Sequence, residues 1–190
     1  MAAKSNNLRE ALILEGIREI NQHGVGGFSI RRVADACNVS CAAPYRHFKD
    51  KNGLIAAIID YVNDRWAARQ EEILAQCGDS LRQQIIEISV GYVRFLMEEP
   101  FYRSVLLLKD EQFDNLYHQK RTQFGSLSQT LEAHLFASSG LDPDVWKRKL
   151  MICRSLIFGC AFLFDAGEFE YNEQNLEYLR YTLNREFDIL

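Results

Sequence analysis

Apolar side chains recur at helical spacing along almost the whole chain, and no convincing run of alternating β-branched residues appears. Ile13, Ile17 and Ile20 fall on one helical face, so a first helix is expected over residues 8–22, with Gly24 just past its end. The pattern therefore predicts an all-α fold of about nine helices.

Two short helices are expected next, separated by a tight turn. Ser29 is suited to cap the first, over residues 30–37, because its hydroxyl can accept a hydrogen bond from a first-turn amide. Ser40 is likewise suited to cap the second, which is expected to end near residue 48. Two short helices joined by a turn match the helix-turn-helix pattern, in which the second helix enters the major groove of DNA.

Longer helices are expected in the rest of the chain. Asp50 or Asn52 opens a fourth helix, and its buried face is expected to hold Ile55, Ile58, Val62 and Trp66. Further helices are expected over residues 81–99, 101–108, 111–137, 143–165 and 172–187. Asp142 and Pro143 form a strong start signal, an N-cap followed by proline in the first turn. The last helix shows an apolar stripe of Leu176, Leu179, Leu183 and Phe187.

The distribution of charge matters more than its total. A net charge of −4 at pH 7 by itself argues against nucleic-acid binding. However, residues 1–51 carry eight Lys and Arg against five Asp and Glu, whereas the remaining residues carry 14 against 21. A basic N-terminal end on an acidic body favours contact of that end with a polyanion.

The five cysteines argue against a disulfide framework or a structural zinc site, because they form no C-x-x-C pair and are odd in number. Reduced thiols are therefore expected. Residues 1–7 lack the apolar stretch of a signal peptide. The apolar stretch of residues 150–164 is too short to span a bilayer comfortably. A cytoplasmic protein with no membrane partner and no metal site is expected.

The most specific feature is the string over residues 27–54, GFSIRRVADACNVSCAAPYRHFKDKNGL. It runs Gly, apolar, Ser, apolar and Arg, then Val-Ala, then a small residue with Val-Ser, and finally Tyr-x-His-Phe before Lys. This string resembles the DNA-binding signature of the tetracycline-repressor family. The resemblance implies a transcription regulator, most commonly a repressor in this family, that a small-molecule effector releases from its operator.

Carried over by position, the resemblance implies a set of phosphate-facing residues. They are Ser29, Arg31, Tyr45, His47 and Lys51. Their hydroxyl, imidazole and cationic groups can donate to phosphate oxygens, and such contacts position a protein on DNA without reading its sequence.

Base reading is expected from the start of the second short helix, and Ser40 at this start is included among the expected DNA-binding residues. The exposed first turns of this helix are expected to present Cys41, Ala42, Ala43 and Arg46. Small side chains offer apolar contact to thymine methyl groups, and an arginine can make a bidentate contact with guanine. An ordinary solvated surface arginine remains the alternative for Arg46.

The resemblance further implies two domains. A DNA-binding domain is expected over residues 1–53, and a helical ligand-binding and dimerisation domain over residues 54–190. The last two helices would pair with those of a second copy across a two-fold axis. An ordinary intrachain core explains their apolar stripes equally well. The implied partners are double-stranded operator DNA, a second copy of the chain and a small-molecule effector, and no cofactor is expected.

Several side chains of the body are candidates for an effector pocket, although aromatic residues at helical spacing more commonly form plain core. The candidates are Tyr92, Phe95, Phe101, Tyr102, His118, Phe124, Arg154, Phe158 and Phe162, with Arg94 and His134 as further polar groups. Arg154 stands in the apolar stretch of residues 150–164, which is expected to be a helix buried on several sides. A guanidinium there needs an anionic partner, for which a protein carboxylate is a better account than a ligand.

Two other classes of function are open alternatives. One is a thiol-based redox regulator that uses Cys37 with Cys41, or Cys153 with Cys160. Exposure and pKa decide thiol reactivity, and the sequence shows neither. The other is an all-helical enzyme, but the sequence has no acid/base pair, nucleophile elbow, phosphate loop or cluster with metal-ligand spacing. The sequence therefore favours a regulator that is not an enzyme.

Overall fold

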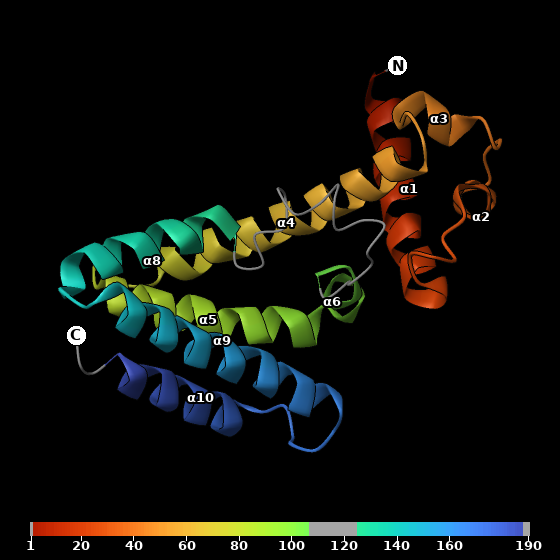
Figure 1. Ribbon diagram of the computed structural model, residues 1–190. Coiled ribbons are helices and arrows are strands. Elements are labelled where there is room, and N and C mark those ends of the chain that lie inside the picture. The colour runs from red at the N-terminus through yellow and green to blue at the C-terminus, as the bar shows by residue number, and fades with distance from the viewer. Residues whose placement is uncertain (1, 107–124, 188–190) are drawn as a thin grey trace. The chain divides into compact units, whose positions relative to one another are not determined.

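The computed structural model describes residues 2–106 and 125–187, and every regular element within them is a helix (Figure 1). The helices are α1 (Ala2–His23), α2 (Ile30–Ala36), α3 (Ala43–His47), α4 (Lys51–Ala75), α5 (Leu81–Glu98), α6 (Pro100–Leu106), α8 (Gly125–Ser139), α9 (Pro143–Asp165) and α10 (Glu173–Glu186). These nine described helices confirm the expected all-α fold. The expected helix over residues 111–137 is seen only from Gly125 onward, because its first part lies outside the described residues.

The chain divides into two compact units. One contains the residues up to Arg65 together with α6, and the other contains Trp66–Glu99 together with α8, α9 and α10. The division falls within α4, which contributes residues to both units. The functional boundary expected at residue 53 stays a prediction, because compactness does not test where DNA binding ends.

The first unit is built around α1, which packs against α2, α3 and α6. Its expected apolar face is confirmed, because Ile13, Ile17 and Ile20 are 1%, 2% and 3% exposed. Ile58 of α4 approaches this helix so closely that a Cβ atom at Gly16 would lie 2.5 Å from its Cδ1. Any other residue at position 16 must therefore displace Ile58.

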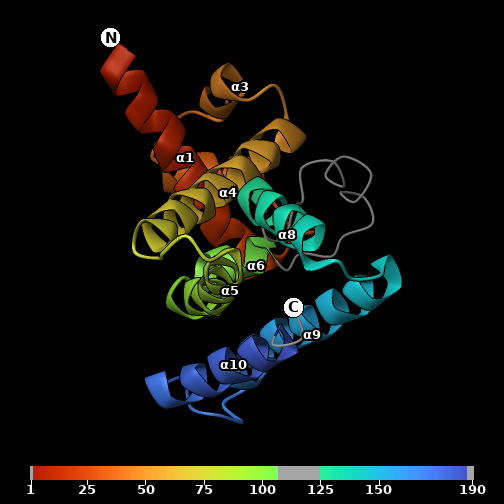
Figure 2. The same cartoon turned by 90° about the vertical axis from the view of Figure 1, so that its left-hand side faces the viewer.

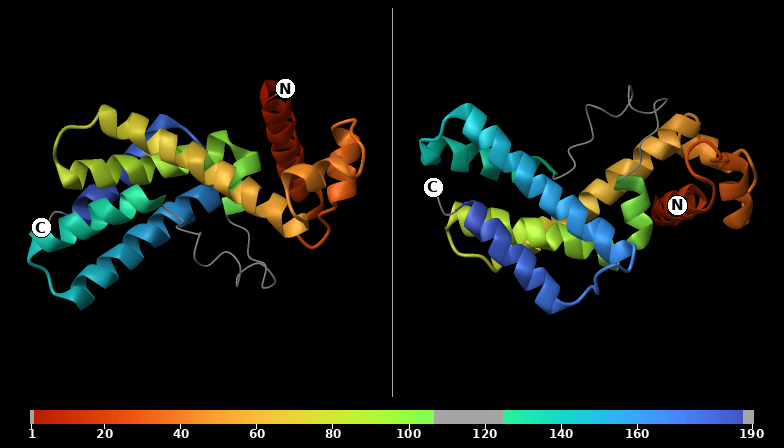
Figure 3. Two further views of the ribbon diagram at one scale, coloured as in Figure 1. Left: turned by 90° about the horizontal axis from the view of Figure 1, so that it is seen from above. Right: turned by 60° about the horizontal axis from the view of Figure 1, so that its bottom comes forward.

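The second unit is built around α5, which packs against α8, α9 and α10 (Figures 2 and 3). Two α5 aromatic rings, those of Tyr92 and Phe95, have centroids 5.0 and 5.3 Å from the ring centroid of Trp66. The expected stripe of α10 is confirmed as buried, at 3% exposure or less, and consists of Leu176, Leu179, Leu183 and Phe187.

Two of the expected helix starts are confirmed by their capping bonds. Asp142 caps α9 by accepting a hydrogen bond from the Asp144 amide at 2.9 Å, with Pro143 as the first helical residue. Asp50 precedes α4, and its carboxylate accepts a hydrogen bond from the Gly53 amide at 2.8 Å. Of the two residues expected to open the fourth helix, the structure therefore selects Asp50.

Two other helix starts differ from the expectation. α1 begins at Ala2 instead of residue 8, because residues 2–7 include good helix formers that extend its first turns. Ser40 does not cap α3, whose N-cap is Ala42. The Ala43 amide instead donates to the Ser40 carbonyl at 2.8 Å in a tight turn, and α3 starts only after this turn.

Within the single chain, the apolar stretch of residues 150–164 is buried on one side, so the expected burial on several sides would require a partner subunit. α9 packs against α5 and α10 of its own unit, and this face holds Cys153, Ile157, Ala161 and Phe164. Its other side is open, since Met151 and Phe162 are 63% and 68% exposed. In the described part of the chain, no helix is both long and apolar enough for a membrane span.

Candidate DNA-binding site

α2 and α3 form a helix-turn-helix held on α1. Ser29 caps α2 as expected, with its hydroxyl accepting a hydrogen bond from a first-turn amide, and Val33 and Ala34 lie on the buried face. The chain reverses at Asn38, whose φ of 54° lies in the left-handed region that asparagine tolerates better than most residues. The Val39 amide then donates to the Ala34 carbonyl at 3.0 Å, which closes the turn.

The outer side of α3 and the turn before it are open to solvent. Tyr45 is 53% exposed, and Cys41, Ala42 and Arg46 are also exposed, as base reading requires. Ala43 is only 9% exposed, so its expected exposure is wrong. Because α3 begins at Ala43 instead of Ser40, Ala43 lies in the first turn of the helix, on the side that faces the core of the helix-turn-helix.

The expected phosphate-facing residues all belong to the first unit. Arg31 is exposed on α2, and Ser29 is half-buried at its N-cap position. His47 ends α3, half-buried, with its ring centroid 6.1 Å from that of Phe48. Their contacts with DNA stay predictions.

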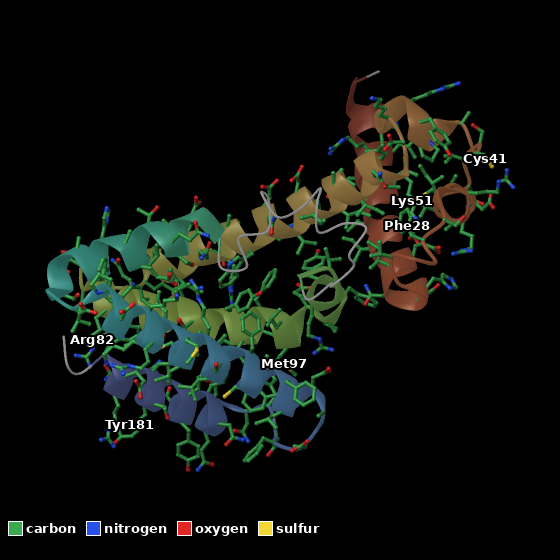
Figure 4. All side chains as sticks on the ribbon, viewed as in Figure 1. Phe28, Cys41, Lys51, Arg82, Met97 and Tyr181 are labelled. Carbon is green, nitrogen blue, oxygen red and sulfur yellow. The ribbon has the colours of Figure 1, made fainter. Side chains whose placement is uncertain are left out.

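Lys51, the first residue of α4, is fixed by the loop between α1 and α2. Its Nζ donates to the Val25 carbonyl at 3.3 Å and lies 5.8 Å from the centroid of the Phe28 ring (Figure 4). An ammonium group has three donors. Lys51 therefore keeps donors for a phosphate while the loop limits where its charge can lie.

A buried carboxylate between α1 and α2 was not found by sequence reasoning. Glu19 is 7% exposed, and its Oε1 accepts hydrogen bonds from the Ser29 amide at 3.0 Å and from Arg32 Nε at 2.9 Å. A terminal nitrogen of Arg32 also donates to Glu19 and to the Gly27 carbonyl. His23 Nε2 lies 3.8 Å from the other carboxylate oxygen.

This network controls the ionisation of Glu19. Burial raises the pKa of Glu19, but the hydrogen bonds from Arg32 and the Ser29 amide, with the charges of Arg32 and His23, outweigh it. The pKa is consequently lowered from its ordinary value of 4.5. The carboxylate is therefore ionised at neutral pH and ties α1 to the start of α2.

Four of the five thiols lack the features of activated cysteines, and the fifth, Cys41, is exposed. Burial raises the pKa of Cys37, Cys77 and Cys160, and it raises the pKa of Cys153 to about 12. A raised pKa keeps a thiol protonated and unreactive at neutral pH, which argues against the redox alternative for these four residues. No group of three or more metal-ligating side chains is found among the described residues.

The candidates for an effector pocket are only partly brought together. Tyr92 and Phe158 meet edge to face with ring centroids 6.1 Å apart, next to Phe95. Phe162 is 68% exposed instead. Phe101 and Tyr102 belong to the first unit, so the structure does not group them with the others. His118 and Phe124 lie outside the described residues.

The expected carboxylate partner of Arg154 is confirmed. Its guanidinium donates to Glu132 Oε2 at 3.0 Å. Burial raises the pKa of Glu132, and Arg154 partly opposes this shift. Nearby in the same unit, the Gln70 amide donates to the Ser128 hydroxyl, and both side chains are buried. The interior of the second unit is therefore partly polar. Arg94, the other cationic candidate, pairs with Glu173 through both terminal nitrogens.

A helix-turn-helix with an exposed second helix, carried by a chain with a longer helical body, defines a DNA-binding transcription regulator. Comparison with known proteins agrees. Residues 12–58 match the family model described as bacterial regulatory proteins, tetR family. The chain is also 25% identical, over 166 residues, to the probable acrEF/envCD operon repressor of Escherichia coli. This alignment covers 84% of the chain and 67% of the repressor.

Solved structures share the fold. A TetR family transcription regulator from Marinobacter aquaeolei superimposes with a TM-score of 0.77 at 18% identity, covering 98% of each chain. A TetR variant from Acinetobacter baumannii, crystallised with minocycline, superimposes with a TM-score of 0.55 at 16% identity, covering 92% of this chain and 91% of that one. The family-model match over residues 12–58, the repressor relative and the shared fold together support a regulator of the tetR family.

The Glu19 network predicts a specific dependence of stability on pH. Because the folded pKa of Glu19 is lowered, its stabilisation is present above the ordinary pKa of 4.5 and is lost as the pH falls through the folded value. Glu19→Gln should therefore lower the free energy of unfolding by about 1–3 kcal/mol near neutral pH. This difference from the wild-type protein should become smaller as the pH is lowered. Urea unfolding of both proteins from about pH 7 to about pH 3 measures this. A deficit that stays constant over that range would contradict the assignment.

Proposed function

We propose that the chain binds double-stranded operator DNA as a homodimer, represses transcription there, and is released by a small-molecule effector. It acts in the cytoplasm, where bacterial chromosomes lie, and by binding alone. The observation that carries the DNA-binding part is the exposed outer side of α3, with Tyr45 and Arg46, in the same unit as Arg31 and Lys51.

Phosphate contacts and base contacts are assigned to different side chains. Phosphates are bound by Ser29, Arg31, Tyr45, His47 and Lys51. Arg46 reads guanine through a bidentate contact, and Cys41 and Ala42 offer apolar contact to thymine methyl groups. The buried Ala43 is left out of this set.

The open sides of α9 and α10 support a dimer. Large apolar or aromatic side chains are exposed there, between 55% and 68%: Met151, Phe162, Phe169, Tyr178 and Tyr181. Figure 4 shows Tyr181 on the outer side of α10. Several large apolar side chains exposed on two adjacent helices and the loop between them favour an interface. A second copy of α9 and α10 would cover it as a four-helix bundle.

The interior of the second unit supports an effector site. Its aromatic cluster of Trp66, Tyr92 and Phe158 lies in the same unit as the polar pair Gln70 and Ser128. A small cavity of about 20 Å³ is lined by Ser128 among others, which is room for one water molecule and not for an effector. An effector bound at this cavity would have to open it, and a TetR protein crystallised with minocycline shares the fold.

α4 is the proposed link between effector and operator. It carries Lys51 at its first residue and Trp66 and Gln70 further along the same helix. The α3 helices of a dimer must lie about 34–36 Å apart to enter successive major grooves. An effector weakens operator binding if it binds best to a form of the dimer in which this spacing is changed. The functional domains are proposed to be residues 1–53 and 54–190, so the first three residues of α4 belong to the first domain and the rest of the helix to the second.

Loss of one phosphate contact should weaken binding to all DNA sequences. Lys51→Ala is expected to make the plot of log affinity against log salt shallower by about 0.9 on operator and random duplexes alike. The operator is first obtained by selection from random duplexes, and affinity is measured by fluorescence anisotropy. Lys147→Ala, an exposed lysine of α9, is the control and should leave the slope unchanged. A loss confined to the operator would refute the phosphate assignment.

Charged substitutions on the open face of α9 and α10 should separate the subunits. Phe162→Glu and Tyr178→Glu place a carboxylate at positions that are 68% and 59% exposed, so each chain should still fold. The expected result is a monomer by light scattering and about a 100-fold loss of operator affinity, because the two half-sites are no longer bound together. Phe101→Glu, at a 52% exposed aromatic of the first unit, should remain dimeric. If Phe162→Glu or Tyr178→Glu remains a dimer, the interface does not lie on this face of α9 and α10.

Effector binding should release DNA. A thermal-shift screen of small apolar compounds identifies those that stabilise the protein, and each is titrated into the operator complex. A true effector is expected to weaken operator binding by about 5–150-fold, and operator DNA should weaken effector binding by the same factor. Ser128→Ala should reduce the thermal shift, whereas Ser155→Ala, at an exposed serine of α9, should not. If saturating compound leaves operator affinity unchanged, the body serves only for dimerisation.

A further inference from the structure

Two neighbouring arginines at the start of α2 have different surroundings. Both side chains are exposed, Arg32 at 49%, but no ion-pair partner for Arg31 is found within the described ranges. Arg32 is held by the Glu19 carboxylate, with Nε at 2.9 Å from Oε1, and by the Gly27 carbonyl. The family resemblance includes Arg31 and not Arg32 in the phosphate-facing set, and among the described residues an internal ion-pair partner is found for Arg32 but not for Arg31.

The same carboxylate also occupies the start of α2. The Ser29 amide, which could otherwise donate to a phosphate, donates to Glu19 at 3.0 Å. Because Glu19 is 7% exposed and ionised at neutral pH, its negative charge stays beside this helix end. A phosphate that accepted from this amide would meet a like charge at short range, so the phosphate contact proposed for Ser29 is made by its hydroxyl and not by its amide.

We propose that Glu19 is a positioning residue that keeps Arg32 and the Ser29 amide away from DNA phosphates and leaves Arg31 as the cationic phosphate contact of α2. This inference rests on the proposed DNA-binding function and adds to it a residue that sets the number of phosphate contacts. The number of neutralised phosphates fixes the salt dependence of binding and most of the affinity for non-specific DNA. Glu19 therefore limits non-specific binding by this module.

The first test compares the two arginines directly. Arg31→Gln and Arg32→Gln remove the same charge from adjacent positions, and binding to a random duplex is measured over a salt series. Arg31→Gln should make the log–log salt slope shallower by about 0.9, whereas Arg32→Gln should leave it at the wild-type value. An equally shallow slope for Arg32→Gln would show that Arg32 reaches a phosphate and would overturn the proposal.

The second test releases Arg32. Glu19→Gln keeps an acceptor for the Ser29 amide but removes the charge, so the salt slope should become steeper by about 0.9 and random DNA should bind more tightly. Adding Arg32→Gln to this variant should restore the wild-type slope. Glu72→Gln is the matched control, because it makes the same charge change and frees Arg69 from an ion pair of 2.9 Å in the second unit. Its slope should stay at the wild-type value.

The outcomes separate this proposal from the function on which it depends. A wild-type slope for folded Glu19→Gln would overturn the role of Glu19, even if Arg31→Gln and Lys51→Ala behave as expected. If the wild-type protein binds no DNA, both the role of Glu19 and the proposed DNA-binding function are overturned. Folding of each variant is checked by circular dichroism, and if Glu19→Gln does not fold, the comparison of Arg31→Gln with Arg32→Gln decides.

Discussion

The DNA-binding surface depends on burial of a small apolar core beneath two very short helices. α2 has seven residues and α3 has five, lengths at which an isolated helix is not stable in water. Their geometry must therefore come from contacts with α1. Val33 of α2 and Phe48, which follows α3, are only 1% and 4% exposed. Each DNA-facing group on α2 and α3 stands where this core places it. The hydrogen bond from Lys51 to the Val25 carbonyl and the hydrogen bonds from Arg32 to Glu19 then hold two cationic side chains in place around this core.

Features carried by local pattern could be predicted from the sequence. The faces of α1 and α10 follow from helical spacing, and the Asp142 and Ser29 caps follow from single residues before helices. Interactions between distant positions could not be predicted in this way. Glu19 and Arg32 lie 13 positions apart, and no periodicity connects them. The buried Ala43 was missed for a related reason, because the turn after Ser40 shifts the start of α3.

The two units show different uses of buried polar groups. In the first, an ionised Glu19 is fully engaged by Arg32 and the Ser29 amide, which favours a single rigid arrangement. In the second, burial raises the pKa of Glu132, and its ion-pair partner Arg154 is exposed. The two carboxylates therefore have pKa values that are shifted in opposite directions.

The left-handed residue at the turn has a consequence for altering operator preference. With a φ of 54°, position 38 accepts asparagine or glycine readily, and a β-branched residue there would be strained. The exposed positions 41, 42 and 46 face no such backbone restriction, so a library that randomises them while keeping Asn38 retains the path of the chain into α3. Selection from such a library tests the proposed base-reading role of these positions without moving the scaffold that presents them.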